Sequence, residues 1–161
     1  VPAVDPQQEL GAVAGDVPIL PGDVVQLAGD RAAAALRAEP GVDVEWQAAD
    51  LTEWEPEPEQ YDLVLLAYMQ APEPMRRALH KKAATALVPG GRVFVIAHHR
   101  DNLEHGVGGP PMIEVLFDES IADDFPGFEV DTNRPVRRLV EQGEISGEAI
   151  DLLLIATKPS A

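Results

Sequence analysis

Three of the four histidines of this chain lie in a single polar segment, residues 98–110. They are His98, His99 and His105, and the segment also contains Asp101 and several glycines. Histidine titrates near neutral pH, so its side chain can take a proton from a hydroxyl or amine that attacks an electrophile. A segment this long and polar is typical of a functional loop. We therefore predict catalytic roles for His98 and His99.

The same histidines could also bind a metal ion, with Asp101 as a carboxylate ligand. Their spacing matches no standard zinc pattern, and the chain contains no cysteine. We therefore predict no metal site. Gly106, Gly108 and Gly109 favour a lid-like bend of this loop over a phosphate-binding cradle.

Two further polar positions, Asp50 and Tyr68, directly follow strand-like segments, as His98 does. Ligands of open α/β sheets bind beyond the carboxyl ends of the strands, so all three are candidates for one binding edge. Each of the first two has a structural alternative. Asp50 could instead cap the turn before Thr52, and Tyr68 could be a buried tyrosine whose hydroxyl is hydrogen bonded.

Strand-like and helix-like segments alternate from Val24 onward, which indicates an α/β layered fold. The nearly continuous apolar runs 61–67 and 92–97 predict strands that are covered on both faces. Between them, a helix opens at Pro72 and ends at residues 89–91. Its apolar residues recur at helical spacing, whereas its basic residues are predicted to face solvent. The apolar set is Met75, Leu79, Ala83 and Leu87, and the basic set is Arg76, Arg77, Lys81 and Lys82.

The C-terminal part predicts a different kind of strand pairing. Asp118 can cap a short helix that ends at Phe125. Two long strand candidates, 128–141 and 149–158, follow with only the polar turn 143–147 between them. Two such strands without an intervening helix must be antiparallel neighbours. The sequence thus predicts parallel βα units that are closed by a C-terminal antiparallel hairpin.

Three segments in order, together with this hairpin, resemble the class I S-adenosylmethionine-dependent methyltransferase family. They are 44–51 (VEWQAADL), 61–68 (YDLVLLAY) and 87–93 (LVPGGRV), which are similar to the family's third strand, its fourth strand and the turn into its fifth strand. The resemblance implies an α/β, Rossmann-like, mostly parallel sheet flanked by helices and ending in an antiparallel β-hairpin. It also implies S-adenosylmethionine as the cofactor and a small molecule as the methyl acceptor.

The resemblance further implies roles for individual residues. Asp50 would accept a hydrogen bond from the adenine amine, and the backbone N–H of Leu51 would serve the neighbouring ring nitrogen. Tyr68 and Met69 would contact the methionine arm of the cofactor or the acceptor. An aromatic ring near the sulfonium is favourable, because a cation is attracted to the quadrupole of the ring. Gly11 is the remaining candidate for contact with the cofactor, in the family's glycine-rich turn.

The N-terminal region departs from the family's pattern. The glycine-rich turn has only a degenerate counterpart in residues 9–15, where Val13 replaces the middle glycine, and Ala28 replaces the acidic residue expected after the second strand. We therefore predict an incomplete first strand and helix unit, weak cofactor binding, and two parts. These are a divergent or irregular arm at 1–23 and a Rossmann-like methyltransferase domain at 24–161. The alternative is a non-catalytic methyltransferase-like binding protein or a gene fragment.

Composition limits the partners and the location. The formal net charge of −16 opposes binding to the phosphate backbone of nucleic acids. The apolar runs are far shorter than the ~20 residues that span a bilayer, and no signal-peptide pattern opens the sequence. A nicotinamide-dependent oxidoreductase would need its own glycine fingerprint, of which the sequence shows no trace. We therefore predict a cytoplasmic protein with a small-molecule substrate and no nucleic-acid or membrane partner.

Overall fold

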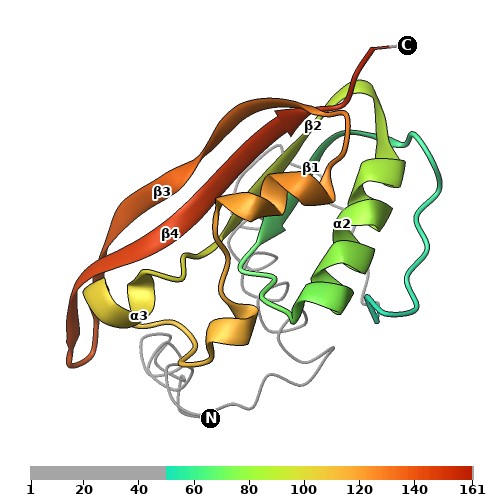
Figure 1. Cartoon of the computed structure of the whole chain (residues 1–161). Helices are drawn as coiled ribbons and strands as arrows, with labels where there is room; N and C mark the ends of the chain where they lie inside the picture. The colour runs from blue at the N-terminus through green and yellow to red at the C-terminus, as the bar shows by residue number, and fades with distance from the viewer. Residues whose placement is uncertain (1–49, 161) are drawn as a thin grey trace, which may run out of the picture.

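The computed structural model describes residues 50–160, where four strands form one sheet in the order β1-β2-β4-β3 (Figure 1). Their bounds are β1 Tyr61–Ala67, β2 Leu87–His98, β3 Glu129–Gln142 and β4 Ile145–Thr157. β1 and β2 are parallel, whereas β4 is antiparallel to both β2 and β3. The predicted C-terminal antiparallel hairpin is therefore confirmed. The prediction of a mostly parallel sheet is not met within these residues, because β4 inserts between β2 and β3 and makes both of its pairings antiparallel.

Several sequence-based predictions concern residues 1–49 and lie outside the described residues. These are the N-terminal arm 1–23, the glycine turn with Gly11, and the strand and helix segments expected between Val24 and Asp50.

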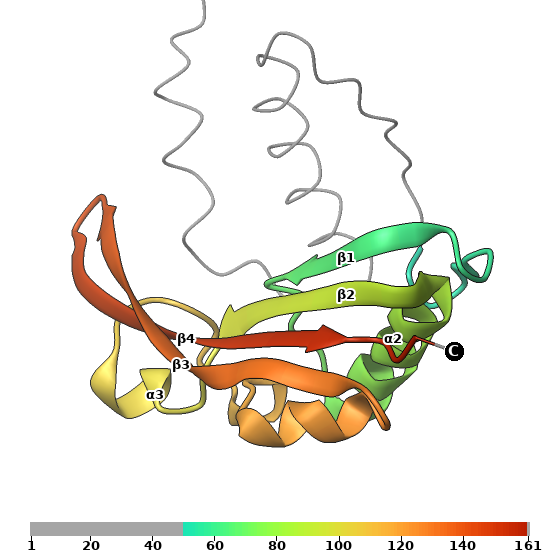
Figure 2. The ribbon, with the colours of Figure 1, turned by 90° about the horizontal axis from the view of Figure 1, so that it is seen from above.

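Helices cover one side of this sheet. The helix α2 (Glu73–Ala86) and the 3₁₀ helix η3 (Glu119–Asp124) both lie on that side (Figure 2). Two shorter helices, α3 (Asn102–His105) and η2 (Ile113–Val115), occur in the connection between β2 and η3. No helix within residues 50–160 is long and apolar enough to cross a membrane.

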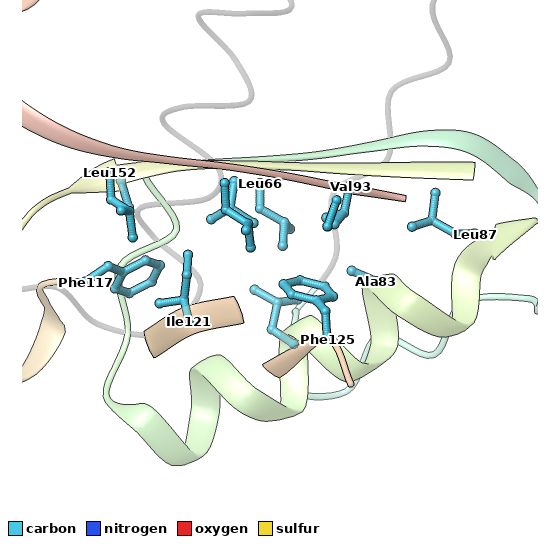
Figure 3. Packing of buried hydrophobic residues seen from close by; sticks show 13 residues of the cluster. Leu66, Ala83, Leu87, Val93, Phe117, Ile121, Phe125 and Leu152 are labelled. Carbon is cyan, nitrogen blue, oxygen red and sulfur yellow. The ribbon is translucent and has the colours of Figure 1, made fainter. Parts of the chain in front are cut away.

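The hydrophobic core lies between the sheet and these helices (Figure 3). Its buried residues include Leu66, Val93, Val95, Leu152 and Leu154 from the strands, and Leu79, Ala83, Ile121 and Phe125 from the helices. Each large apolar side chain that is fully buried contributes roughly 1.5–3 kcal/mol to the free energy of folding. On β1 the alternation of a strand is clear, since Leu66 is 8% exposed but Leu63 and Leu65 are 55% and 62% exposed. Within residues 50–160, no element covers the opposite face of β1.

The helix α2 begins as predicted and ends earlier than predicted. Pro72 occupies the N-cap position, where its missing N–H costs nothing. Leu87 already has extended backbone angles, φ −78° and ψ 138°, so the helix stops at Ala86 and residues 87–91 belong to β2. The ammonium group of Lys158 donates to the carbonyls of Ala84 and Leu87 at 3.3 and 2.6 Å, which places a cation at the negative end of the helix.

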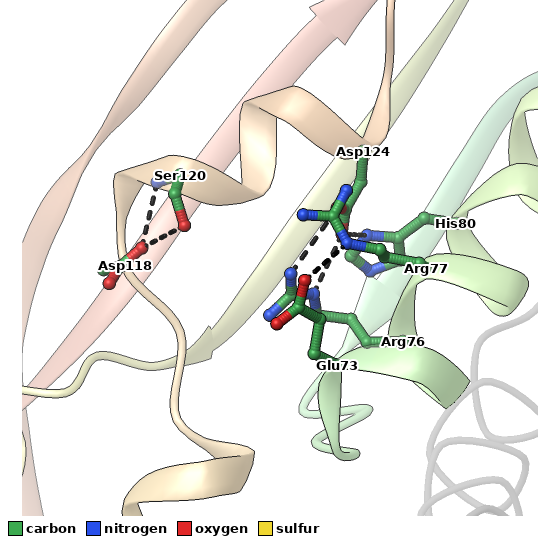
Figure 4. A network of polar contacts seen from close by, with 7 residues as sticks. All are labelled: Glu73, Arg76, Arg77, His80, Asp118, Ser120 and Asp124. Carbon is green, nitrogen blue, oxygen red and sulfur yellow. Dashed lines mark hydrogen bonds and ion pairs between the residues drawn. The ribbon is translucent and has the colours of Figure 1, made fainter.

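A buried ionic network joins α2 to η3 (Figure 4). Arg76 was predicted to face solvent, but it is only 8% exposed. Its Nε donates to Oδ2 of Asp124 at 2.9 Å. Nδ1 of His80 lies 2.8 Å from the same oxygen, and Arg77 reaches Oδ1 of Asp124 at 3.0 Å. Burial favours the neutral carboxyl, but the bonds from His80 and Arg76 outweigh it and lower the pKa of Asp124. The prediction that Arg76 faces solvent is wrong, because η3 packs against the side of α2 that carries Arg76.

The remaining local predictions concern η3 and the hairpin. Asp118 caps η3 as predicted, since its Oδ1 accepts from the backbone N–H of Ser120 at 3.0 Å. The hairpin turn is tighter than predicted, because Gln142 already pairs with Ile145. Gly143 supplies the positive φ, +57°, that this turn requires.

Candidate functional site

Tyr68 and His98 lie together at the carboxyl ends of the two parallel strands. Tyr68 follows β1, His98 is the last residue of β2, and the two strands are paired neighbours. The centroids of their rings are 5.1 Å apart with an interplanar angle of 47°. The structure thus joins two of the residues that the sequence singled out, at the edge where open α/β sheets bind ligands.

A buried carboxylate, Asp151, lies at the centre of this group. It is directly opposite His98 in the ladder between β2 and β4, and it is 0% exposed. The hydroxyl of Tyr68 and the Nε of Arg138 each donate to its Oδ2 at 2.8 Å. Nδ1 of His98 lies 3.1 Å from its Oδ1. Tyr68, His98, Arg138 and Asp151 are called the Asp151 cluster below.

The partners of Asp151 fix its charge. Burial alone would raise the pKa of this carboxyl, but the close contact with His98 and the hydrogen bonds from Arg138 and Tyr68 outweigh burial and lower its pKa to about 2. Burial and the bond to Asp151 raise the pKa of Tyr68, so its phenol stays protonated. The bond to Asp151 raises the pKa of Arg138. At neutral pH the cluster therefore contains one carboxylate, one guanidinium and one phenol that acts as a hydrogen-bond donor.

The contact between His98 and Asp151 is shielded from solvent. Nδ1 of His98 and Oδ1 of Asp151 are both buried and face each other at 3.1 Å, in an orientation too oblique for a regular hydrogen bond. Gly109 packs on the imidazole, since a Cβ at this position would lie 3.0 Å from Cδ2 and Cγ and 3.1 Å from Nδ1 of His98. Its φ of +82° is also one that glycine adopts without strain. Because Nδ1 faces Asp151, Nε2 is the ring nitrogen left for proton exchange with an acceptor.

The loop that contains Gly109 is anchored on β4. The buried side chain of Asn102 accepts from the N–H of Ile150 at 2.7 Å and donates to the carbonyl of Gly108 at 2.8 Å. The N–H of Val107 donates to the carbonyl of Glu148 at 3.0 Å. These bonds hold the glycine segment against His98.

The backbone of Tyr68 has an unusual conformation. Its φ is +53°, which is uncommon for a residue that is not glycine. Such a conformation costs roughly 1–3 kcal/mol and is found most often at functional sites. Its N–H donates to the carbonyl of Ile96 at 2.7 Å, so β1 remains paired with β2 up to this residue. The change in backbone direction comes where the side chain of Tyr68 reaches Asp151.

His99 is separate from the Asp151 cluster, although it is adjacent to His98 in the sequence. Its side chain is 5% exposed, and its Nδ1 accepts from the N–H of Asp101 at 3.1 Å. Its Nε2 lies 3.4 Å from a carboxylate oxygen of Glu119. Both ring nitrogens are thus engaged in contacts that hold the loop, whereas His105 is 66% exposed in its side chain.

The predicted cofactor residues have varied surroundings. Asp50 is exposed, and its Oδ1 accepts from the N–H and the hydroxyl of Thr52 at 2.8 and 2.7 Å. These bonds lower the pKa of Asp50. They are the contacts expected if Asp50 caps the turn before Thr52. The carboxylate remains ionised. Leu51 and Met69 are partly buried and pack against the hydrophobic core. Gly11 lies outside the described residues.

Sequence reasoning missed Arg138 and Asp151. Asp151 had a detectable signal, because it is the single charged residue in the apolar run 149–156, and a buried carboxylate requires partners. The sequence did not show that β4 would place it beside His98.

A shallow hollow of about 390 Å³ lies elsewhere on the molecule. It is lined by α2, by the segment before β1, by the connection from η3 to β3 and by the C-terminal segment, and its residues include Lys81, Thr85, Phe128 and Lys158. None of the four residues of the Asp151 cluster lines it.

Comparisons with known proteins found structural likeness only. No protein-family model matches the sequence, and no curated protein matches it. A solved structure of a SAM-dependent methyltransferase from Methanosarcina mazei is 15% identical, with 84% of this chain and 79% of that chain covered and a TM-score of 0.59. The N-methyltransferase NodS from Bradyrhizobium japonicum is 19% identical, with 86% and 71% covered and a TM-score of 0.58. NodS in complex with S-adenosyl-L-homocysteine also matches, at 16% identity, 81% and 62% coverage and a TM-score of 0.52.

Proposed function

Because this chain has the fold of class I S-adenosylmethionine-dependent methyltransferases, we propose that it transfers a methyl group from S-adenosylmethionine to a small-molecule acceptor. The observation that carries the proposal is the buried carboxylate of Asp151 beside the imidazole of His98, at the carboxyl ends of β1 and β2. A histidine that faces a buried carboxylate is the arrangement of a general base and the group that orients it.

The described residues fit a sulfonium cofactor at this edge. Tyr68 presents an aromatic ring in a strained backbone conformation at the end of β1. The face of such a ring favours a nearby cation. Tyr68 and Met69 would hold the methionine arm, and Asp50 and Leu51 would hold the adenine. The exposed, ionised carboxylate of Asp50 is able to accept a hydrogen bond from the adenine amine.

The contacts within the Asp151 cluster suggest a role for each of its side chains in methyl transfer. When bound, S-adenosylmethionine supplies a methyl group that is electrophilic because it is attached to a sulfonium. Nε2 of His98 takes the proton of the acceptor's hydroxyl or amine as the acceptor attacks. Asp151 holds Nδ1 of His98 and stabilises the imidazolium ion that forms. Tyr68 and Arg138 keep the carboxylate of Asp151 ionised and in place.

The proposal is tested by measuring methyl transfer from labelled S-adenosylmethionine to a panel of phenols, amines and carboxylic acids that carry a hydroxyl. We expect His98→Gln to lower kcat by roughly 10²–10⁴-fold and to leave the Kd for the cofactor unchanged. The matched control is His105→Gln, whose side chain is exposed and which should keep full activity. A protein that binds no S-adenosylmethionine at millimolar concentration, or equal rates for His98→Gln and the wild type, would refute the proposal. The first result would favour a non-catalytic relative of the methyltransferases.

A further inference from the structure

The strand β3 contains three arginines close together in an otherwise acidic protein. Arg134, Arg137 and Arg138 are three of only 12 basic residues in a chain that has 28 acidic ones. In the register of the sheet, Arg134 pairs with Leu153 and Arg138 with Ala149, so both extend to the same face as Asp151. Arg137 extends to the other face and pairs with Glu148 at 2.9 Å. The arginines therefore divide between the face of the Asp151 cluster and the opposite face.

Arg138 combines a fixed guanidinium with an exposed end. Its Nε donates to the fully buried Asp151, and its Cζ lies 5.5 Å from the centre of the Tyr68 ring. Its side chain is nevertheless 43% exposed. The bond at Nε fixes the plane of the group, and the two Nη groups have no acidic partner other than Asp151 within residues 50–160. A guanidinium that is held in this way is suited to bind an oxyanion with its free edge.

Arg134 adds charge on the same face. It lies four residues before Arg138 on the strand, a spacing of roughly 13 Å. It makes no ion pair with any acidic side chain in the described part of the chain. An anion that approaches this face therefore meets two arginines, whereas Asp151, the carboxylate bonded to Arg138, is completely buried.

We propose that the methyl acceptor carries a carboxylate or phosphate group and that Arg138 binds this oxyanion, while His98 takes the proton from the acceptor's nucleophilic group. This inference rests on the proposed function and names the substrate class of the same site. Arg138 thereby selects anionic acceptors and also orients them, because Asp151 ties its guanidinium to the imidazole of His98.

The test measures binding of three probes to the full chain by isothermal titration calorimetry without cofactor. The probes are benzoate, phenyl phosphate and the neutral benzamide, so the first two separate a carboxylate from a phosphate as the preferred group. We expect at least one anion to bind tenfold or more tightly than benzamide. We expect Arg138→Met to weaken that binding tenfold or more, and Arg137→Met, the neighbouring arginine on the other face, to change it less than twofold. Benzamide binding as tight as both anions, or undiminished anion binding by Arg138→Met, would overturn the inference.

A second variant guards against simple loss of folding. Arg138→Gln keeps an N–H donor toward Asp151 but removes the charge, so it should fold and should show the same loss of anion binding. The proposed methyl transfer and the proposed oxyanion site can be refuted independently of each other. Arg138-dependent anion binding without methyl transfer would support the oxyanion site and refute the enzyme. Methyl transfer to neutral acceptors as fast as to matched carboxylic acids would support the enzyme and refute the inference.

Discussion

Oδ1 of Asp151 and Nδ1 of His98 face each other at 3.1 Å on neighbouring antiparallel strands, and neither atom has another hydrogen-bond partner within the described residues. Buried polar atoms without a regular hydrogen bond are rare in folded proteins and require an explanation. Here the explanation is electrostatic: with the ring hydrogen on Nδ1, His98 faces a carboxylate that is already ionised, and this attraction strengthens once Nε2 also carries a proton. The arrangement is therefore ready to stabilise a proton taken from an acceptor.

The first prediction concerns catalysis by this pair. Asp151→Asn keeps the size of the side chain but removes the charge that would stabilise the imidazolium of His98. We expect kcat for methyl transfer to fall roughly 10²-fold or more, with little change in the Kd for S-adenosylmethionine. Steady-state kinetics and calorimetry check this. As the control, Asp131→Asn alters a carboxylate that pairs with Arg92 away from the cluster and should leave kcat unchanged. An Asp151→Asn enzyme with normal kcat would remove Asp151 from the mechanism.

The second prediction concerns stability in acid. The pKa of Asp151 is about 2 in the folded protein and near 3.9 in an unfolded chain. Because the folded value is the lower one, the ionised carboxylate favours the folded state above about pH 4, and this stabilisation is lost as the pH falls toward 2. The contribution is on the order of 2 kcal/mol. Urea unfolding at pH 6, 4, 3 and 2 should show a gap between wild type and Asp151→Asn that shrinks over this range. A gap that stays constant with pH would contradict the prediction.

The third prediction concerns the network between α2 and η3. Asp124→Ala leaves the buried Arg76 without its carboxylate, so we expect the free energy of unfolding to fall by roughly 3–5 kcal/mol. Glu73→Ala removes an exposed ion pair with Arg77 and should cost less than about 0.5 kcal/mol. Urea unfolding at neutral pH measures both. Similar losses for the two variants would show that burial does not strengthen this network.

The fourth prediction concerns the packing of Gly109 on His98. Gly109→Ala would place a methyl group 3.0 Å from the imidazole, so the ring or the loop must move. Gly108→Ala is the control, because Gly108 has a similar φ, +71°, but no atom within 4 Å of an added Cβ. Both variants should lose about 1–2 kcal/mol of stability from backbone strain. Only Gly109→Ala should lower kcat further, by about tenfold or more, since a displaced catalytic group is costly. Equal kcat values for the two variants would show that this contact does not position His98.

The fifth prediction concerns Asp50. Asn can still accept the hydrogen bonds of Thr52 that form the turn, so Asp50→Asn should fold normally. If the carboxylate also binds the adenine amine, the variant should bind S-adenosylmethionine several-fold more weakly in calorimetry. The wild-type affinity itself is expected to be weak, in the high micromolar range. Equal affinities would leave Asp50 with the role of a turn cap alone.

The sequence by itself determined the features that depend on neighbouring residues. The strand 61–67, the helix start at Pro72, the cap at Asp118 and the antiparallel pairing of the last two strands were all predicted correctly. Each follows from a local cause: a run of apolar residues, a fixed φ, a side-chain oxygen near free N–H groups, or a connection too short for a crossover. The position of His98 at a strand end belongs to the same class.

The tertiary structure decided which distant side chains meet. Asp151 reaches His98 only because β4 pairs with β2 in one register, and a shift of one residue would turn Asp151 to the other face. Arg138 joins them through the register of β3 on β4. Arg76 is buried only because η3 brings Asp124 onto α2. These contacts depend on packing between elements far apart in the chain, and the free energy that selects them comes from burying the core, so the pattern along a single element does not contain them.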